Sequence, residues 1–380
     1  MANLLDYIDW RGDLSFEKSP LNEVDLAVLA TFSYIDLKNI VPADEQTISL
    51  FQAYLNMYND PEVRSVPEGN NQQRKLELFR KMAASARYSQ LKLSGYREVL
   101  SAVGVEGASE QFAAVTIILP DGTNVAAFRG TDDNLAGWKE DLYLTMQESI
   151  PAQISAAEYL KWTFFAHPGN FHVCGHSKGG NIGIYAAASL PDQEKSRILS
   201  IVNLDGPGFH AAFIHSAAYQ SIAEKLLSIR PEYSIVGSFF YNRGSSFYVQ
   251  TSAPGLAAHT CFSWELLGTA FVRAPGLRNS SRILDEKLET VLSEMDDEAR
   301  KHFISELFEI LTINGSETVG DITKLRPAKL LGMMKEFKNS PEISRFMKSF
   351  LEEYLRDLRD FGTSLLPRKK PAEPSPAGEF

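Results

Sequence analysis

One short stretch of the chain joins a strand-like run to a helix-like run through a glycine-flanked serine. Residues 171–174 are apolar and β-prone, and residues 181–190 have the alanine content of a helix that packs against a sheet. Between them, Gly175 and Gly179 flank Ser177 in the spacing G-x-S-x-G. The residues two positions from such a serine must be small, because larger side chains would collide across the turn. We therefore expect an abrupt strand-to-helix turn with a strained serine at its tip.

This arrangement is typical of the nucleophile elbow of α/β-hydrolases. The turn would raise the Ser177 hydroxyl above a sheet and point the positive end of the next helix at any negative charge that develops there. Helices and strands also alternate between residues 150 and 252, which indicates a mainly parallel sheet with crossover helices. The predicted fold class is therefore an α/β-hydrolase fold, with a mainly parallel central sheet flanked by helices.

The 380 residues divide into four predicted parts. Residues 1–86 read as an N-terminal helical segment packed on the core, and residues 87–271 as the α/β-hydrolase core. Residues 272–365 are helical and charged, so we expect a C-terminal helical cap. The Pro-rich polar tail, residues 366–380, is predicted to be disordered.

Periodicity and turn signals place individual elements within these parts. Helices are expected at residues 22–30, 46–58, 73–84, 152–165, 215–229, 283–311, 328–338 and 344–361. Strands are expected at residues 111–119, 123–128, 171–174, 198–205, 233–240 and 246–252. The turn signal Pro120-Asp121-Gly122 predicts that the first two strands form a hairpin.

Composition narrows the classes of partner. The net charge is −10 and no basic stripe is present, so we expect no nucleic-acid partner. No segment approaches the ~20 apolar residues that span a bilayer, and the N-terminus lacks the basic and apolar regions of a signal peptide. The two cysteines, Cys174 and Cys261, suit a reducing cytosol. We therefore expect a cytoplasmic protein, with no cofactor and, since no Cys or His pair has ligand spacing, no metal site.

A serine hydroxyl needs a base to take its proton and an acid to orient that base. In this fold the chain order is serine, acid, histidine, and the histidine lies after the last strand. His259 follows the final predicted strand and is the candidate base. The other histidines precede the serine, come too early for that loop, or lie on a charged helix: His167, His172, His176, His210, His215 and His302.

The acid has two candidates. Asp205 ends the strand after the elbow helix and so lies at the carboxyl edge of the sheet, where sites form in such folds. It also precedes Gly206-Pro207, so it could simply form a turn. Glu232, just before the next predicted strand, is the competitor.

An oxyanion hole needs two backbone N–H donors aimed at the developing charge. One candidate is Lys178, the residue after the nucleophile. The other is Thr131, which follows the end of the strand predicted at residues 123–128.

Three segments occur in the order in which class 3 (fungal-type) lipases carry similar ones. They are Phe-Arg-Gly-Thr at residues 128–131, Gly-Trp-Lys-Glu-Asp-Leu at residues 137–142 and Gly-His-Ser-Lys-Gly-Gly at residues 175–180. The chain resembles these lipases over roughly residues 85–265. The longer string FRGTDD…GWKEDL, with LDGPGF after the elbow, is still closer to an uncharacterised lipase-like family of bacterial cytosolic proteins.

The resemblance implies an α/β-hydrolase fold with a Ser–acid–His site at Ser177 and His259, and with Thr131 and Lys178 as oxyanion donors. This sequence departs from the family pattern in two places. Lys178 occupies the usual leucine position, and Ser234 stands where class 3 lipases take their acid from a D-x-V-P-like segment.

Three alternatives for the acid follow from that second departure: Asp205, Glu232, or an incomplete triad. The leading hypothesis is a serine esterase or lipase that cleaves a small acyl ester or a lipid through an acyl-enzyme at Ser177. A catalytically weak or inactive hydrolase fold that serves as a binding or scaffold protein is the alternative. A thioesterase or peptidase would use the same residues, and the sequence leaves the natural substrate and the oligomeric state open.

Overall fold

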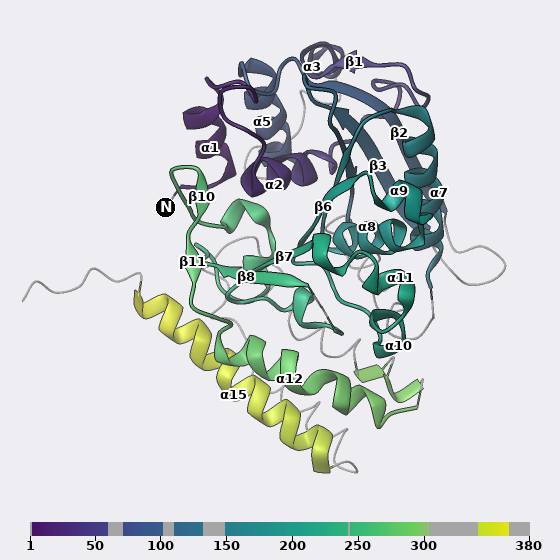
Figure 1. Cartoon of the computed structure of the whole chain (residues 1–380). Coiled ribbons are helices and arrows are strands. Elements are labelled where there is room, and N and C mark those ends of the chain that lie inside the picture. The colour runs from purple at the N-terminus through teal and green to yellow at the C-terminus, as the bar shows by residue number, and fades with distance from the viewer. Residues whose placement is uncertain are drawn as a thin grey trace, which may run out of the picture.

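A nine-stranded sheet forms the centre of the described part of the molecule (Figure 1). The computed structural model describes residues 2–59, 71–101, 110–131, 149–241, 244–296, 298–300, 302–303 and 341–364. In spatial order the strands are β1 (Ile48–Ser49), β2 (Lys92–Ser101), β3 (Glu110–Ile118), β4 (Asn124–Phe128), β5 (Phe171–His176), β6 (Ile198–Leu204), β7 (Leu226–Pro231), β8 (Ser245–Val249) and β11 (Arg273–Ala274). A separate hairpin pairs β9 (Leu266–Leu267) with β10 (Ala270–Phe271).

The middle of the sheet is parallel and its ends are antiparallel. Neighbouring strands from β4 to β8 pair in parallel, whereas β1 to β4 and the pair of β8 with β11 are antiparallel. The predicted hairpin at Pro120-Asp121-Gly122 is confirmed, since β3 and β4 pair across it. With helices on both faces and the serine turn after β5, this is the α/β-hydrolase fold that the sequence predicts.

Helices cover both faces of the sheet. The α-helices are α1 (Leu4–Arg11), α2 (Glu23–Phe32), α3 (Leu50–Tyr58), α5 (Asn71–Ala84), α7 (Pro151–Ala166), α8 (Lys178–Ser189), α9 (Asp192–Lys195), α10 (Ala211–Ile214), α11 (Ala217–Gln220), α12 (Asn279–Ser293) and α15 (Pro341–Ser364). The described residues also include the 3-10 turns η1 (Ala223–Lys225), η2 (Val236–Ser238), η3 (Gly255–His259) and η4 (Cys261–Ser263).

Side chains along the central strands point alternately to the two faces of the sheet, which explains the two layers of helices. On β4, Val125 and Ala127 face a core shared with α1, α2, α3 and α5, while Ala126 and Phe128 face a core shared with α7 and α8. All four side chains are fully buried. A strand covered on both faces reads as a continuous apolar run, as β4 does.

The C-terminal helices make a third apolar cluster. Together, α12 and α15 enclose Ile235 and Phe239 from the segment after β7, and in Figure 1 the two helices lie side by side in green and yellow. The α15 helix also reaches η3, because a Cβ on Gly255, which has φ +57°, would lie 2.6 Å from the Tyr354 hydroxyl oxygen. The C-terminal helices therefore contact two segments that border the carboxyl edge of the sheet.

Two predicted elements between residues 215 and 240 are wrong. The helix expected at residues 215–229 is replaced by α11, η1 and the start of β7. The strand expected at residues 233–240 is a turn containing η2, because β7 already fills the place beside β6, with Leu226–Ile229 opposite Ile201–Leu204. The pairing of β7 with β6 decides which residues form the strand, and no local sequence pattern predicts that pairing.

Other expected elements differ at their ends or lie outside the described residues. The helix expected at residues 46–58 begins only at Leu50, after the two residues of β1, and α12 ends at Ser293. Helix 328–338, the tail 366–380 and the Trp-containing segment 137–142 lie outside the described residues.

Candidate active site

The turn after β5 has the strained geometry that the G-x-S-x-G spacing predicts. Ser177 has φ +57° and ψ −134°, between the end of β5 at His176 and the start of α8 at Lys178. A Cβ on Gly175 would lie 2.3 Å from the carbonyl carbon of Gly179, and a Cβ on Gly179 would lie 2.2 Å from the carbonyl oxygen of Phe128, so neither glycine has room for a side chain. A non-glycine residue in such a conformation costs about 1–3 kcal/mol, which the surrounding packing must supply.

The end of β4 lies directly against this serine. A Cβ on Gly130 would be 3.1 Å from the Cβ of Ser177 and 2.6 Å from the carbonyl oxygen of His176. The next residue, Thr131, is buried, and so is Lys178 at the first position of α8. Backbone N–H groups in the first turn of a helix have no intrahelical acceptor, so they can serve as donors to an external oxygen. Of the two candidate oxyanion residues, Lys178 directly follows Ser177, and Thr131 directly follows Gly130, which lies against Ser177.

Asp205 lies immediately after β6, where the chain turns with φ +50°. Its backbone N–H donates to the carbonyl of Ile229 at 2.9 Å, and its side chain is fully buried. One carboxylate oxygen, Oδ2, is 2.7 Å from Nδ1 of His259. Since a carboxylate only accepts, Nδ1 carries a proton, and in the neutral form of the ring the lone pair is therefore on Nε2.

Glu232, the competing acid, has a different partner. Its Oε2 accepts from Nε of Arg278 at 2.6 Å, and its backbone carbonyl accepts from the Arg278 N–H at 2.7 Å. The structure therefore places Asp205 beside His259 and pairs Glu232 with the chain leading into α12.

Ser234 contacts the other oxygen of Asp205. Its hydroxyl donates to Oδ1 at 2.5 Å, and the side chain is fully buried. Ser234 thus contacts the candidate acid that follows the neighbouring strand β6. The sequence marks this position only as a departure from the family pattern.

His176, set aside in the sequence because it precedes the serine, also reaches this region. Its Nε2 lies 2.8 Å from the carbonyl oxygen of His259 and must donate to it, and its Nδ1 lies 2.8 Å from the hydroxyl of Tyr34. The rings of His176 and His259 have centroids 4.4 Å apart. Burial, followed by the charge of nearby His259, holds the pKa of His176 well below its ordinary value, so His176 is neutral near pH 7.

Tyr34 follows α2, which begins at Glu23 with Asn22 as its N-cap. The Asn22 side chain accepts from the N–H groups of Val24 and Asp25, and the Asp25 side chain accepts from the Asn22 N–H. This reciprocal cap starts a helix that is buried along nearly its whole length and packs against β5. The N-terminal helices thereby position Tyr34 beside the elbow.

Within the residues that the structure describes, no group of three or more His, Cys, Asp or Glu side chains lies close enough to hold a metal ion. None of the helices in those residues combines the length and apolarity needed to cross a bilayer.

Comparisons with known proteins give one family and several remote structures. The family described as Mbeg1-like matches residues 82–309, more than half of the chain. No curated protein sequence matches.

Three of the similar solved structures are lipases. The Rhizomucor miehei lipase propeptide complex is 13% identical, with 59% of this chain and 67% of that chain covered and a TM-score of 0.34. The lipase from Rhizopus microsporus var. chinensis is 12% identical, with 60% and 76% covered and a TM-score of 0.33. A nonglycosylated Yarrowia lipolytica lipase is 15% identical, with 63% and 90% covered and a TM-score of 0.34. Likenesses of this size say nothing about the substrate of the present chain.

Proposed function

The chain belongs to the Mbeg1-like family, and we propose that it is a serine hydrolase that cleaves the carboxylic ester of a small acyl ester or a lipid. One observation carries the proposal: His259 is held at 2.7 Å by the buried carboxylate of Asp205, on the carboxyl edge of the sheet that also bears the strained Ser177. Nucleophile, acid and base then follow the chain order of α/β-hydrolases.

The reaction moves one proton in each step. Oγ of Ser177 attacks the acyl carbonyl carbon while Nε2 of His259 takes the hydroxyl proton, and Asp205 stabilises the resulting imidazolium through Nδ1–H. The tetrahedral intermediate collapses, the C–O bond to the alcohol breaks, and Nε2 returns its proton to the leaving oxygen. A water molecule then attacks the acyl-enzyme with the same proton transfers, which releases the acid and restores Ser177.

Charge on the carbonyl oxygen needs fixed donors. The backbone N–H groups of Lys178 and Thr131 are proposed for this role, because Lys178 opens α8 directly after the nucleophile and Thr131 follows the Gly130 contact with Ser177. Donors held in place before the reaction stabilise the oxyanion without the cost of reorienting solvent. Their burial strengthens the interaction, since water does not screen it.

Turnover of short-chain p-nitrophenyl esters tests the proposal. We expect the wild-type chain to hydrolyse them and Ser177→Ala to lose kcat by about 10⁶-fold, down to the background that binding alone provides. Equal turnover by the two proteins would contradict a serine mechanism. A wild type that turns over none of a series of esters and thioesters would favour a binding or scaffold protein.

A further inference from the structure

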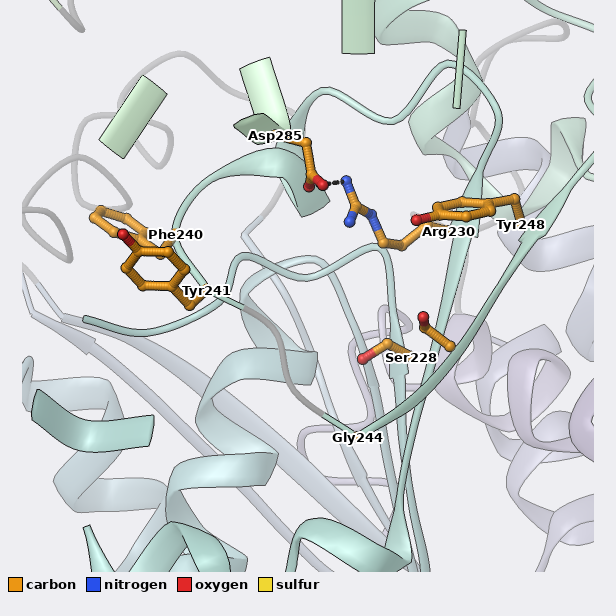
Figure 2. A pocket seen from close by; sticks show the side chains of 8 residues that line it. Ser228, Arg230, Phe240, Tyr241, Gly244, Tyr248 and Asp285 are labelled. Atoms are coloured by element: carbon orange, nitrogen blue, oxygen red, sulfur yellow. Dashed lines mark ion pairs between the residues drawn. The ribbon is translucent and has the colours of Figure 1, made fainter. Parts of the chain in front are cut away.

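A polar cavity of about 170 Å³ lies on one face of the β7–β8 pair (Figure 2). Ser228 and Arg230 line it from β7, opposite Ser246 and Tyr248 of β8 in the strand register. Asp285 of α12 lies across the cavity, and Figure 2 shows its carboxylate turned toward the guanidinium of Arg230. The Arg230 side chain is almost fully buried although it borders this open space.

From the cavity wall, Arg230 connects to the proposed catalytic acid through one serine. Its Nε lies 3.3 Å from Oγ of Ser234, whose hydroxyl lies 2.5 Å from Oδ1 of Asp205. A guanidinium has only donors and a carboxylate only acceptors, so the direction of both bonds is fixed. Arg230 donates to Ser234, and Ser234 donates to Asp205.

The far side of the guanidinium is anchored to α12. Nη2 of Arg230 lies 2.8 Å from Oδ1 of Asp285 and donates to Oγ of Ser238 at 2.6 Å. In the chain, Ile235 and Phe239 lie before and after Ser238, and both pack into the apolar cluster of α12 and α15. The C-terminal helices therefore hold both Arg230 and the turn that carries Ser234.

The turn leaves no spare room at the acid. A Cβ on Gly237 would lie 2.4 Å from Oδ1 of Asp205, 2.8 Å from Oγ of Ser234 and 3.1 Å from Nε of Arg230. All three polar groups thus converge on one glycine, and only a residue without a side chain allows this approach.

We propose that Ser234 and Arg230 are positioning residues for Asp205, a role that rests on the function proposed above. Ser234 occupies Oδ1, which leaves Oδ2 for His259 and fixes the plane of the carboxylate. Arg230, held by Asp285, fixes Ser234 and supplies positive charge beside the acid. The segment that provides the acid in class 3 lipases provides the donor that holds the acid here.

Two serines of this region allow a matched comparison. Ser234→Ala removes a hydrogen bond to a charged group, so we expect kcat to fall tenfold or more, in line with the strength of such bonds, while KM stays within about twofold. Ser228 is equally buried, but its Oγ has no hydrogen-bond partner in the described part of the chain. Ser228→Ala should therefore keep the wild-type kcat.

Charge substitutions give a readout that loss of packing would not produce. Among the described residues, the ionisable groups around Asp205 and His259 include Cys261 beside the carboxylate and His176 beside the imidazole, with Arg230 and Asp285 beyond Ser234. Arg230→Gln removes positive charge, so the carboxylate holds the imidazolium more strongly and the acidic limb of the kcat/KM profile moves to higher pH. Asp285→Asn removes negative charge and should move that limb to lower pH.

A measurement without turnover separates this inference from the proposed function. We expect the Nδ1 proton of His259, which is bonded to the Asp205 carboxylate, to give a downfield ¹H NMR resonance that can be assigned by its loss in His259→Ala. We expect Ser234→Ala and Arg230→Gln to shift this resonance and Ser228→Ala to leave it in place. If the wild type is active, and Ser234→Ala has the same kcat and the same resonance position as Ser228→Ala, the positioning role is overturned while the proposed function stands. An inactive wild type whose resonance still responds to Ser234→Ala would contradict the proposed function and support the contact.

Discussion

Three hydrogen bonds give the individual residues their places in the candidate site. Asp205 accepts from His259 through one oxygen and from Ser234 through the other, and His176 donates to the backbone carbonyl of His259. Each bond joins segments at least 29 positions apart in the chain. The roles proposed for these residues therefore depend on how strand ends meet, and single substitutions test them one bond at a time.

At this scale the decisive pair is Asp205 and Glu232. Asp205→Asn keeps the size of the side chain but removes the negative charge that accepts Nδ1–H of His259 and stabilises its imidazolium. We therefore expect kcat to drop on the order of 10⁴-fold. Glu232→Gln is the control, because the Glu232 carboxylate pairs with Arg278 and the Asp205 carboxylate pairs with His259. Ester hydrolysis by both variants is compared under identical conditions. If Glu232→Gln caused the larger loss, the acid assigned here would be wrong.

At the scale of elements, β7 and the turn after it organise the carboxyl edge. β7 ends at Pro231, and the turn through η2 then carries Ser234 back to Asp205. The α12 and α15 helices pack on this turn and, through Tyr354, on the η3 segment that bears His259. The C-terminal helices thus act as support for the site, through both apolar packing and the pair of Arg230 with Asp285.

The packing of α15 predicts a specific loss of stability. Phe350 is fully buried in the cluster that α15 shares with α12 and with Ile235 and Phe239. Phe350→Ala should lower the free energy of unfolding by about 3–5 kcal/mol, measured by urea denaturation. Lys348, on the same helix with 64% of its side chain exposed, provides the control, and Lys348→Ala should change stability by less than about 0.5 kcal/mol. Equal stability of the two variants would show that α15 does not pack as described.

At the scale of the whole molecule, local patterns predict some features well and distant pairings poorly. The turn at Ser177 is predictable because its sterics lie within five residues, and the hairpin of β3 and β4 because one turn signal joins the strands. β7 is not predictable in this way, because residues 226–229 also fit the end of a helix. Only the pairing with β6 shows that they form a strand. Pairing across the sheet decides such short apolar runs.

The same limit applies to the candidate site. Chain order, the expected loop after the last strand and the charged helix around His302 together select His259 from seven histidines. They leave Asp205 and Glu232 open, because both lie close to strand ends. Only the three-dimensional contacts, Asp205 with His259 and Glu232 with Arg278, separate them. No local sequence pattern predicts the contact of Ser234 with Asp205, since it joins two turns from different strand ends.

The most direct test of a nucleophilic serine is covalent labelling by a serine-directed fluorophosphonate, read by intact mass and peptide mapping. We predict that the wild-type chain gains one phosphonyl group on Ser177, that Ser177→Ala gains none, and that Asp205→Asn is labelled much more slowly. Labelling needs an activated hydroxyl but no natural substrate, so the unknown acyl group does not affect the result. A wild type that stays unlabelled, or a label that maps to another residue, would contradict the account.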